Sequence, residues 1–189
     1  MYDHLKSNIR HLGHFSEDEM DVFISKSEVL QLKKGDHFLK EGQVSNYIAY
    51  INKGLAMHYQ IYDGEEIPCD FTTQDNWLAY LKSFASRQPS DMNIKVLEDT
   101  ELFAFSGQKL QELFEEQPKF QVVKNYNIEK SFVELAKRGN DFVVLDAKKR
   151  YQQLVQTRPD LINRVPQYHL AAYLGIKPQS LSRIRKEMD

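Results

Sequence analysis

The sequence has one cysteine, no long apolar run, and none of the short motifs that identify common enzymes. The lone Cys69 cannot close an intrachain disulfide or supply the several thiolates of a structural zinc or iron–sulfur site. No run of about 18 apolar residues occurs, and the N-terminus lacks the apolar segment of a signal peptide. There is also no Gly-rich phosphate loop and no nucleophile elbow. We therefore expect a cytoplasmic protein without a membrane partner, a catalytic residue, a bound metal or another cofactor.

Cys69 itself follows Pro68 in a stretch with the composition of a strand. Such a thiol can act as a redox sensor when it is exposed and its thiolate is stabilised, or as a small apolar side chain when it is buried. Both interpretations stay open at the level of sequence.

The net charge of -2 hides an uneven distribution along the chain. Residues 147–189 contain nine lysines and arginines against three acids, whereas the preceding residues contain 16 basic and 24 acidic side chains. A basic segment on an acidic body suits a polyanion, because neutralised phosphates supply most of the sequence-independent affinity for nucleic acid. The alternative is a solvated basic face with no partner. With 189 residues, the chain has room for one large or two small domains.

The stretch from Val165 to Met188 predicts two short helices joined by a tight turn. Gly175 follows the first apolar stripe, where a helix can end on a left-handed residue, and Pro178 suits the first position of the second helix because that position needs no N–H donor. We expect the following side chains to form the buried stripes: Leu170, Ala171, Leu174, Leu181, Ile184 and Met188. The polar and basic residues of the second helix then face outwards. A helical hairpin within an ordinary core would show the same pattern.

Short apolar stretches separated by glycines predict antiparallel strands between residues 28 and 105. Asp63-Gly64 is a hairpin signal, because both central residues of the favoured turn need positive φ. Two short helices precede the strands, and Ser16 with Glu19 forms a capping box for the second of them. We therefore expect a β-roll or jelly-roll sandwich after two N-terminal helices.

Three helices are predicted after the strands, over residues 108–114, about 119–137, and 146–157. Ser106 and Asp146 are the expected N-caps of the first and third. The segment Arg138–Asp141 is predicted to break the long helix as a hinge, because glycine is conformationally permissive. Part of the long helix approximates a coiled-coil seam, which Glu129 interrupts and which consists of Val122, Tyr126, Val133 and Ala136. A helix packed only within its own chain is the alternative.

Two separate parts of the sequence resemble the Crp/Fnr transcription regulators. The phrase AAYLGIKPQSLSRIRKE, residues 171–187, is similar to the helix-turn-helix signature of that family. A second set of residues is similar, in type and order, to the first half of the family's cyclic-nucleotide-binding β-roll. This set is Lys34-Gly35-Asp36, Glu41-Gly42, Tyr47-Ile48, Ile51, Lys53-Gly54 and Asp63-Gly64-Glu65. Together the two matches cover most of the chain.

The resemblance implies an α+β fold in three parts. These are an N-terminal double-stranded β-helix or jelly-roll sensor domain over residues 1–115, a long dimerisation helix and hinge over 116–140, and a C-terminal helix-turn-helix DNA-binding domain over 141–189. The implied protein is a homodimer that reads a palindromic site on double-stranded DNA with its 178–188 helix. RNA polymerase and a small-molecule effector are further candidate partners.

The resemblance also suggests which side chains meet DNA. Gln179 can pair with adenine and Arg183 with guanine in the major groove, and we assign Ser180 to the same group of base contacts. Pro178 cannot make a polar base contact, although family members often carry an arginine at this position, so the usual half-site of the family is not assumed. The predicted contacts to the DNA backbone are Lys177, Ser182, Arg185 and Lys186.

The second half of the β-roll departs from the nucleotide-binding pattern. Where the resembling proteins carry an Arg-Ser or Arg-Thr pair that holds the cyclic phosphate, this chain has Ser90 and Asp91. A carboxylate beside a phosphate repels it, and Arg87 could substitute only in a shifted register. We therefore predict that cyclic AMP is not the ligand, and the effector stays unknown. The candidate pocket residues are Phe71, Trp77, Tyr80, Arg87, Ser90 and Asp91, although core packing also explains the aromatic ones.

Two other functions stay open at the level of sequence. A β-roll protein that binds a ligand or another protein could keep a vestigial helix-turn-helix, and a cupin-like metal enzyme would share the β-roll. The enzyme alternative lacks the His-x-His and following Glu of such a metal site, and His11 and His14 have no third ligand nearby. The sequence stops at Asp189, so we expect no β-wing after the second helix and stabilisation from upstream elements or a partner subunit.

Overall fold

The computed structural model describes residues 1–188, which form two compact units. The first unit contains residues 1–58 and 71–129, and the second contains residues 59–70 and those from 130 onwards. The expected end at Asp189 lies outside the described residues. Within residues 1–188, no helix combines the length and the apolar character that crossing a bilayer requires.

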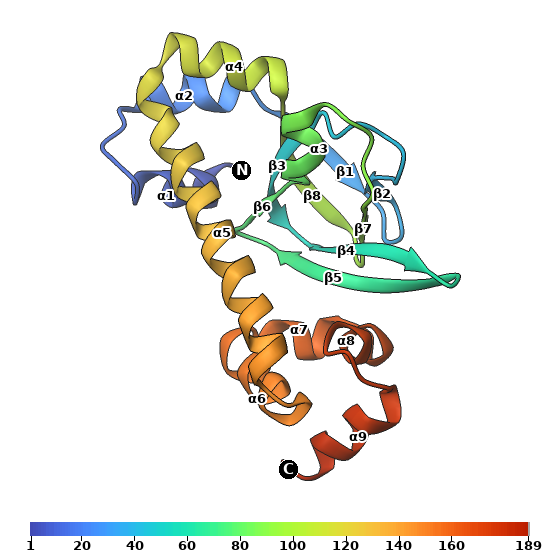
Figure 1. The fold of residues 1–189 in the computed structure, drawn as a ribbon. Coiled ribbons are helices and arrows are strands. Elements are labelled where there is room, and N and C mark those ends of the chain that lie inside the picture. The colour runs from blue at the N-terminus through green and yellow to red at the C-terminus, as the bar shows by residue number, and fades with distance from the viewer. Residues whose placement is uncertain (189) are drawn as a thin grey trace. The chain divides into compact units, whose positions relative to one another are not determined.

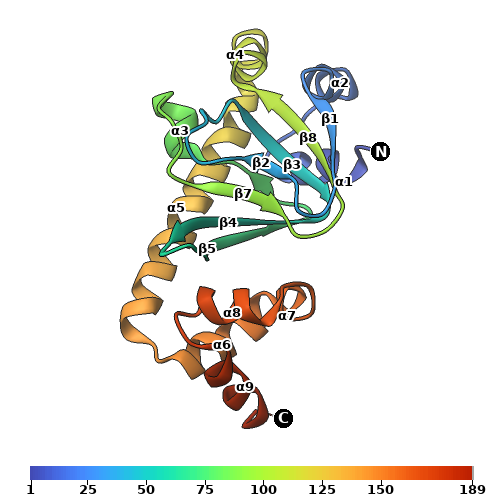
Figure 2. The same cartoon turned by 90° about the vertical axis from the view of Figure 1, so that its right-hand side faces the viewer.

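Eight short strands within the described residues build two four-stranded sheets. One sheet has the strand order β1-β8-β3-β6. The other has the strand order β2-β7-β4-β5 (Figure 2). The strands are β1 (Glu28–Leu32), β2 (His37–Leu39), β3 (Tyr47–Lys53), β4 (Leu55–Tyr62), β5 (Glu65–Thr73), β6 (Trp77–Leu78), β7 (Asn93–Val96) and β8 (Thr100–Ser106). β8 pairs antiparallel with both β1 and β3, with Leu30 opposite Leu102 and Ala49 opposite Ala104. Apolar side chains of both sheets form one core cluster, because alternate residues of a strand point to the same side.

The predicted hairpin at Asp63-Gly64 is confirmed between β4 and β5. Both residues have positive φ, 49° at Asp63 and 79° at Gly64. This is the backbone that a two-residue hairpin turn requires, so the local signal alone was sufficient to locate it.

Three helices pack together against the first sheet: α1 (Asp3–Arg10), α2 (Glu17–Ser25) and α4 (Gly107–Glu116) (Figure 1). The predicted capping box of α2 is present, because the Ser16 hydroxyl accepts from the Glu19 N–H and the Glu19 carboxylate accepts from the Ser16 N–H. The Lys26 ammonium lies 2.8 Å from the Glu116 carboxylate and links α2 to α4. These helices share a core with β3 and β8, formed by Leu5, Ile9, Met20, Phe23, Tyr50, Phe103, Phe105, Leu110, Leu113, Phe120 and Val123.

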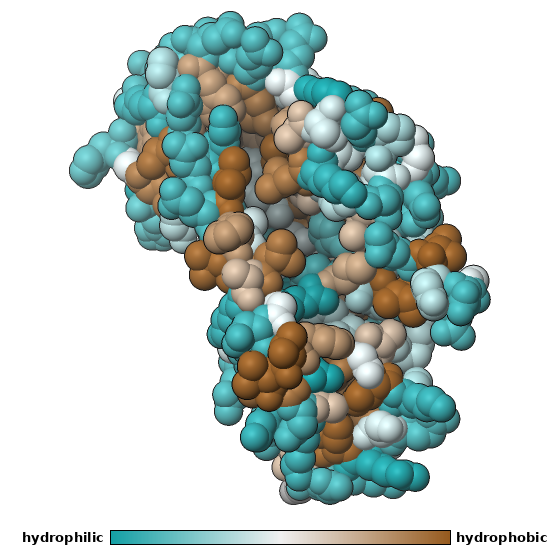
Figure 3. Space-filling model, viewed as in Figure 1, coloured by the Kyte–Doolittle hydropathy of each residue, from teal (hydrophilic) through white to brown (hydrophobic). Residues whose placement is uncertain are grey.

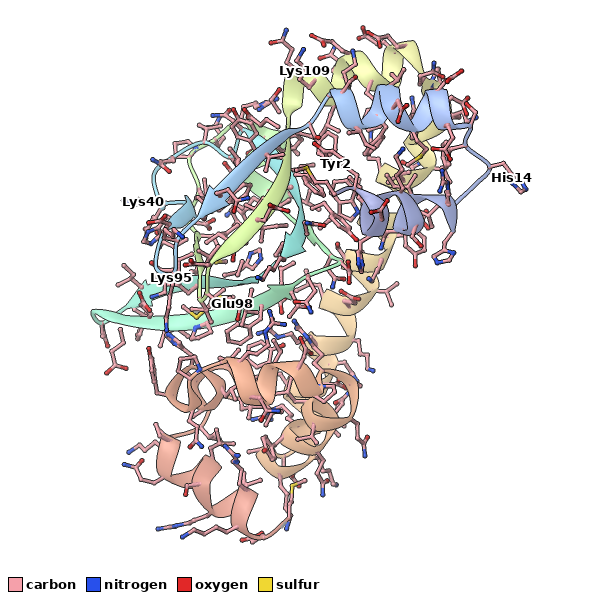
Figure 4. All side chains as sticks on the ribbon, turned by 180° about the vertical axis from the view of Figure 1, so that it is seen from behind. Tyr2, His14, Lys40, Lys95, Glu98 and Lys109 are labelled. Carbon is pink, nitrogen blue, oxygen red and sulfur yellow. The ribbon has the colours of Figure 1, made fainter. Side chains whose placement is uncertain are left out.

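In the N-terminal segment, Tyr2 packs against the protein, whereas His14 points into solvent (Figure 4). The Tyr2 ring lies 4.3 Å from the ring of Phe103 in β8, measured between centroids. His14 points away from the protein and is exposed. Residues 1–188 contain no group of three His, Cys, Asp or Glu side chains that could hold a metal ion.

The long helix extends further than the sequence indicated. A short 3-10 turn, η1 (Pro118–Phe120), leads into α5 (Gln121–Val144), which continues through Arg138–Asp141 without a break. The predicted hinge at this position is therefore wrong. Gly139 keeps a backbone with negative φ. A single glycine costs a helix only about 1 kcal/mol, and each further residue adds a hydrogen bond, so the helix propagates past it.

Four helices follow α5 in the part of the chain that the structure describes: α6 (Ala147–Thr157), α7 (Pro159–Arg164), α8 (Gln167–Tyr173) and α9 (Pro178–Lys186). The Asp146 carboxylate accepts from the Lys149 N–H at 2.8 Å, which confirms it as the N-cap of α6. α6 ends at Thr157, as predicted, and Pro159 begins α7, a helix that was not predicted from the sequence. The buried apolar side chains of these helices are Tyr151, Leu154, Leu161, Val165, Leu170, Ala171, Leu174 and Leu181. α3 (Leu81–Ser86), in the first unit, follows β6.

Candidate nucleic-acid interface

The turn between α8 and α9 is fixed by backbone bonds around Gly175. This residue adopts φ +69°, in the left-handed region that favours glycine. The Gly175 N–H donates to the carbonyl of Ala172 at 2.9 Å, and the Ile176 N–H donates to the carbonyl of Ala171 at 3.0 Å. This is the Schellman arrangement that satisfies the last carbonyls of a helix. Pro178 then starts α9, as the sequence predicted.

The buried side of α9 packs on α8. Leu181 is fully buried, and Leu170, Ala171 and Leu174 of the preceding segment are buried with it. Met188, in contrast, is 38% exposed, so its assignment to the buried stripe is wrong. The expected burial of Met188 assumed a helix through residue 188, where Met188 would lie one turn after the half-buried Ile184. α9 ends at Lys186, so this spacing does not apply to Met188.

The outer side of α9 is polar and basic. Its exposed side chains are Gln179, Ser180, Ser182, Arg183 and Lys186, joined by Lys177 just before the helix, whereas Arg185 is half-buried. Within residues 1–188, no acidic side chain forms an ion pair with Arg183 or Lys186. The structure therefore places the three expected base-contact residues on one exposed side, next to positive charge that the described protein does not neutralise.

The far end of α9 is held by an ion pair to α6. The Lys148 ammonium lies 2.7 Å from the Glu187 carboxylate. The hydrogen bond from Lys148 holds the pKa of the Glu187 carboxyl below its usual range. Lys148 is therefore occupied in positioning α9, a role that its place in a run of basic residues did not reveal.

The outer part of the β4–β5 hairpin, residues 59–70, belongs to the same compact unit as these helices. The Asp70 carboxylate lies 3.0 Å from the Arg158 guanidinium, at the α6–α7 connection, and 3.9 Å from that of Arg138 in α5. The Arg138 guanidinium also stacks 4.3 Å from the centroid of the Tyr173 ring in α8. A single acidic residue on the hairpin thus contacts two of the arginines that neighbour α8.

Two further residues, His169 of α8 and Cys69 of β5, are buried and half-buried respectively. The Nε2 atom of His169, which is buried in α8, lies 3.8 Å from the Glu66 carboxylate of β5. Burial raises the pKa of the Cys69 thiol, which disfavours the thiolate that redox sensing uses. The environment of Cys69 therefore favours the interpretation as a packed side chain over that as a sensor.

The position expected to repel a cyclic phosphate is occupied by an internal network. The Asp91 carboxylate lies 2.6 Å from the Lys82 ammonium of α3 and accepts a short hydrogen bond from the Tyr80 hydroxyl. These two bonds lower the pKa of Asp91 to about 2. Ser90 is buried, and its hydroxyl bonds to the backbone of Met92. The segment therefore keeps a full negative charge and already has its partners within the chain.

The other candidate pocket residues do not gather around Asp91. Trp77 packs in the core of the N-terminal helices, with ring centroids 5.5 Å from Tyr50 and 5.7 Å from Phe105. Phe71 is buried, and Arg87 extends over the Phe84 ring, 5.2 Å from its centroid. Of the six candidate pocket residues, three lie together: Ser90 and Asp91 are neighbours in the chain, and the Tyr80 hydroxyl bonds to Asp91. Core packing thus accounts for Trp77, the alternative considered for the aromatic residues.

Most of the surface of α5 is exposed, and much of it is apolar (Figure 3). Exposed side chains include the expected seam residues Val122, Tyr126, Val133 and Ala136, and also Ile128, Phe132, Leu135 and Phe142. The second set follows the alternating 4 and 3 spacing of a coiled-coil seam, with Gly139 filling the interval before Phe142. This second row was not predicted from the sequence, although the spacing of its residues is visible there. Phe132, which is 71% exposed, is at its centre.

Comparison with known proteins gives one family match and several structural ones. Residues 29–117 match the family model of the cyclic nucleotide-binding domain. The cyclic di-GMP responsive global regulator CLP of Xanthomonas campestris is 15% identical, with a TM-score of 0.72 over 92% of this chain and 91% of its own. A variant of CooA from Carboxydothermus hydrogenoformans is 16% identical, with a TM-score of 0.71 over 87% of this chain and 77% of its own. A transcriptional regulator of the Crp/Fnr family from Eubacterium rectale is 13% identical, with a TM-score of 0.67 over 92% of this chain and 83% of its own. No curated protein matches the chain in sequence.

Proposed function

We propose that this chain, which contains a cyclic nucleotide-binding family domain over residues 29–117 and has the fold of Crp/Fnr transcription regulators, is a homodimeric DNA-binding regulator. Its matched family and structural neighbours are regulators rather than enzymes. In this proposal α8 and α9 are a helix-turn-helix, and α9 enters the major groove. Its partners are double-stranded DNA, a second copy of the chain, and RNA polymerase at the regulated promoter.

The observation that carries the proposal is the outer side of α9. Gln179, Ser180 and Arg183 are exposed together and can meet base edges, where Gln suits adenine and Arg suits guanine. Lys177, Ser182, Arg185 and Lys186 are assigned to the phosphates, which set register without selecting sequence. Within residues 1–188, Arg183 and Lys186 form no ion pair with an acidic side chain, which leaves their charges available to DNA and supports this proposal over a vestigial helix-turn-helix.

Two-fold pairing along α5 completes the proposed arrangement. The exposed apolar rows on this helix would be buried by the same helix of a second copy, and a symmetric pair of α9 helices suits a palindromic site. We keep a sensor domain over residues 1–115 and a DNA-binding domain over 141–189 as proposed boundaries. The proposed dimerisation helix between them is α5, which begins at Gln121 rather than at the expected residue 116 and ends at Val144 rather than at 140.

The sensor domain is proposed to respond to something other than cyclic AMP. The cyclic phosphate would meet Asp91, whose charge is held by Lys82 and Tyr80. Arg87, which is the arginine nearest in sequence to Ser90 and Asp91, extends over the Phe84 ring instead. A small-molecule effector of different chemistry is compatible with this proposal.

The proposal is tested by selecting bound duplexes from a random DNA library with the full-length protein. We expect enrichment of a palindrome with two half-sites about one helical turn apart. Arg183→Ala should then relax sequence choice within each half-site, with a loss of about 1 to 3 kcal/mol on the selected site and little loss on other DNA. Lys186→Ala is the matched cation control and should weaken all duplexes about equally.

The selection also has a clear negative result. If no sequence were enriched and the protein bound random duplexes no better at low salt than at high salt, the vestigial alternative would stand. If Arg183→Ala and Lys186→Ala changed affinity alike across all sequences, the proposed docking of α9 would be wrong even though the protein binds DNA.

A further inference from the structure

The end of α5 lies directly beneath the turn between α8 and α9. A Cβ atom placed on Gly175 would stand 2.7 Å from the Cζ atom of the Phe142 ring, which is closer than real contacts allow. Gly175 also has φ +69°. Glycine is therefore required here twice, for its backbone conformation and for the space that the Phe142 ring occupies.

Arg150 of α6 joins the same two places by hydrogen bonds. Its guanidinium donates to the carbonyl of Leu174, at the end of α8, with an Nη2 to O distance of 2.8 Å. It also donates to the carbonyl of Leu145, just after α5, and its Cζ atom lies 4.4 Å from the centroid of the Phe142 ring. The planar guanidinium is suited to this role, because its donors point in fixed and different directions.

The chain leaves little other freedom at this point. Only Leu145 and Asp146 separate α5 from α6, and Asp146 is engaged as the N-cap of α6. The Gln153 amide of α6 donates to the Asp141 carboxylate of α5 at 2.9 Å. Because α5 is unbroken through Gly139, the direction of α8 and α9 relative to α5 is set at this contact rather than by an upstream hinge.

We propose that Phe142, Arg150 and Gly175 are positioning residues that fix the direction of α9 relative to α5 and thereby the half-site spacing that the dimer accepts on DNA. The proposal rests on the proposed function, since α5 must pair and α9 must read DNA for the spacing to follow. Arg150 does not touch DNA in this role. It acts by holding the last carbonyls of two helices at a fixed separation.

The first experiment measures the joint without DNA. Spin labels are attached to Lys137→Cys in α5 and Ser182→Cys in α9, both exposed, in a Cys69→Ser background, and the labelled chain is mixed with an excess of unlabelled chain. We expect a narrow distance distribution by pulsed electron paramagnetic resonance. Arg150→Lys keeps the charge but loses the fixed fork, and it should broaden the distribution. Arg164→Lys is the matched control in α7, and it should leave the distribution narrow.

The second experiment uses duplexes that carry the selected half-sites with the central spacing changed one base pair at a time. The wild type should prefer one spacing, and Arg150→Lys should reduce that preference by about fivefold while affinity for a single half-site stays unchanged. Arg164→Lys should retain the wild-type preference. If Arg150→Lys does not fold, as judged by circular dichroism, Phe142→Leu replaces it in the distance measurement, because it removes the ring beneath the guanidinium.

The two experiments separate this inference from the function on which it rests. An unchanged distance distribution and an unchanged spacing preference in Arg150→Lys would overturn the positioning role while DNA binding stands. A wild type that binds no duplex would overturn both the regulator function and the claim on spacing. A general loss of affinity, equal for single and paired half-sites, would assign Arg150 to stability or DNA contact instead and would also overturn the proposal.

Discussion

Asp91 shows how one side chain can decide which ligands the proposed sensor domain accepts. The position follows a buried serine whose hydroxyl is already bonded to the backbone, and its own carboxylate is bonded to Lys82 and Tyr80. With a pKa of about 2, Asp91 remains charged at every pH at which the protein is expected to work. A bound phosphate would face this charge, and Lys82 is already engaged with it.

The residue-scale prediction concerns cyclic AMP. Isothermal titration of the wild-type protein should show no binding at micromolar concentrations at pH 7. Asp91→Asn should not bind either, because it removes the repulsion but supplies no cationic donor for the phosphate. Micromolar binding by the wild type would contradict the prediction. It would mean that another group of the chain binds the cyclic phosphate in place of the arginine that the resembling proteins carry.

At the scale of an element, α5 continues through Gly139, although glycine lowers helix propensity. Gly139 is exposed within the helix, and a Cβ placed there would meet nothing within 4 Å in the described residues. Gly139→Ala should therefore raise the free energy of unfolding by about 0.5 to 1 kcal/mol, through helix propensity and a less flexible unfolded chain. Chemical denaturation followed by circular dichroism measures the change.

The matched control for this prediction is Gly175, another glycine of the same compact unit. Gly175→Ala should lower the free energy of unfolding, because φ +69° is strained for alanine and the new Cβ would collide with Phe142. Gly139 lies in the second exposed row of α5, so the measurement is made in the Phe132→Gln background, which is expected to be monomeric. A loss of stability from Gly139→Ala in that background would contradict the continuous helix and would mean that residues 138–141 open as a hinge.

The elements that the sequence predicted correctly are those with a short-range cause. Ser16, Ser106 and Asp146 cap their helices through side-chain bonds to the N–H three residues on, and Asp63-Gly64 makes its hairpin turn. These interactions connect neighbours in the chain, so their signature is local. The resemblance to Crp/Fnr regulators is likewise confirmed at the level of fold.

The parts that sequence reasoning missed depend on residues far apart in the chain. Phe142 and Gly175 meet across an interval that no spacing rule covers, and the same is true of Asp70 with Arg158. The helix through Gly139 depends on a sum of small propensities rather than on one signal. For the candidate interface, the exposure of Gln179, Ser180 and Arg183 followed from the helical period, whereas the contacts that hold α9 in place did not.

At the scale of the whole molecule, the proposed function needs two copies of the chain. One α9 covers one half-site, and the affinity of a palindrome comes from joining two half-sites through the dimer. In the proposed dimer, the two copies are joined through the apolar rows of α5. In the single chain these apolar side chains are exposed to water, which is unfavourable. In the proposed dimer, the α5 helix of the second copy would cover them.

Phe132→Gln tests this requirement. Phe132 is mostly exposed in the single chain, so the substitution should leave the fold of the subunit intact. In a dimer seam it removes at least about 1.5 kcal/mol of apolar burial from each copy, which raises the dimer dissociation constant by more than about tenfold. Sedimentation velocity should therefore show monomer at concentrations where the wild type is dimeric, and affinity should fall for the palindrome but not for a single half-site.

Lys137→Gln, at an exposed position on the other side of α5, should behave as the wild type. If Phe132→Gln sedimented as the wild-type dimer, the seam through Ile128, Phe132 and Leu135 would be wrong, and the row Val122, Tyr126 and Val133 would be the next to test by the same substitution.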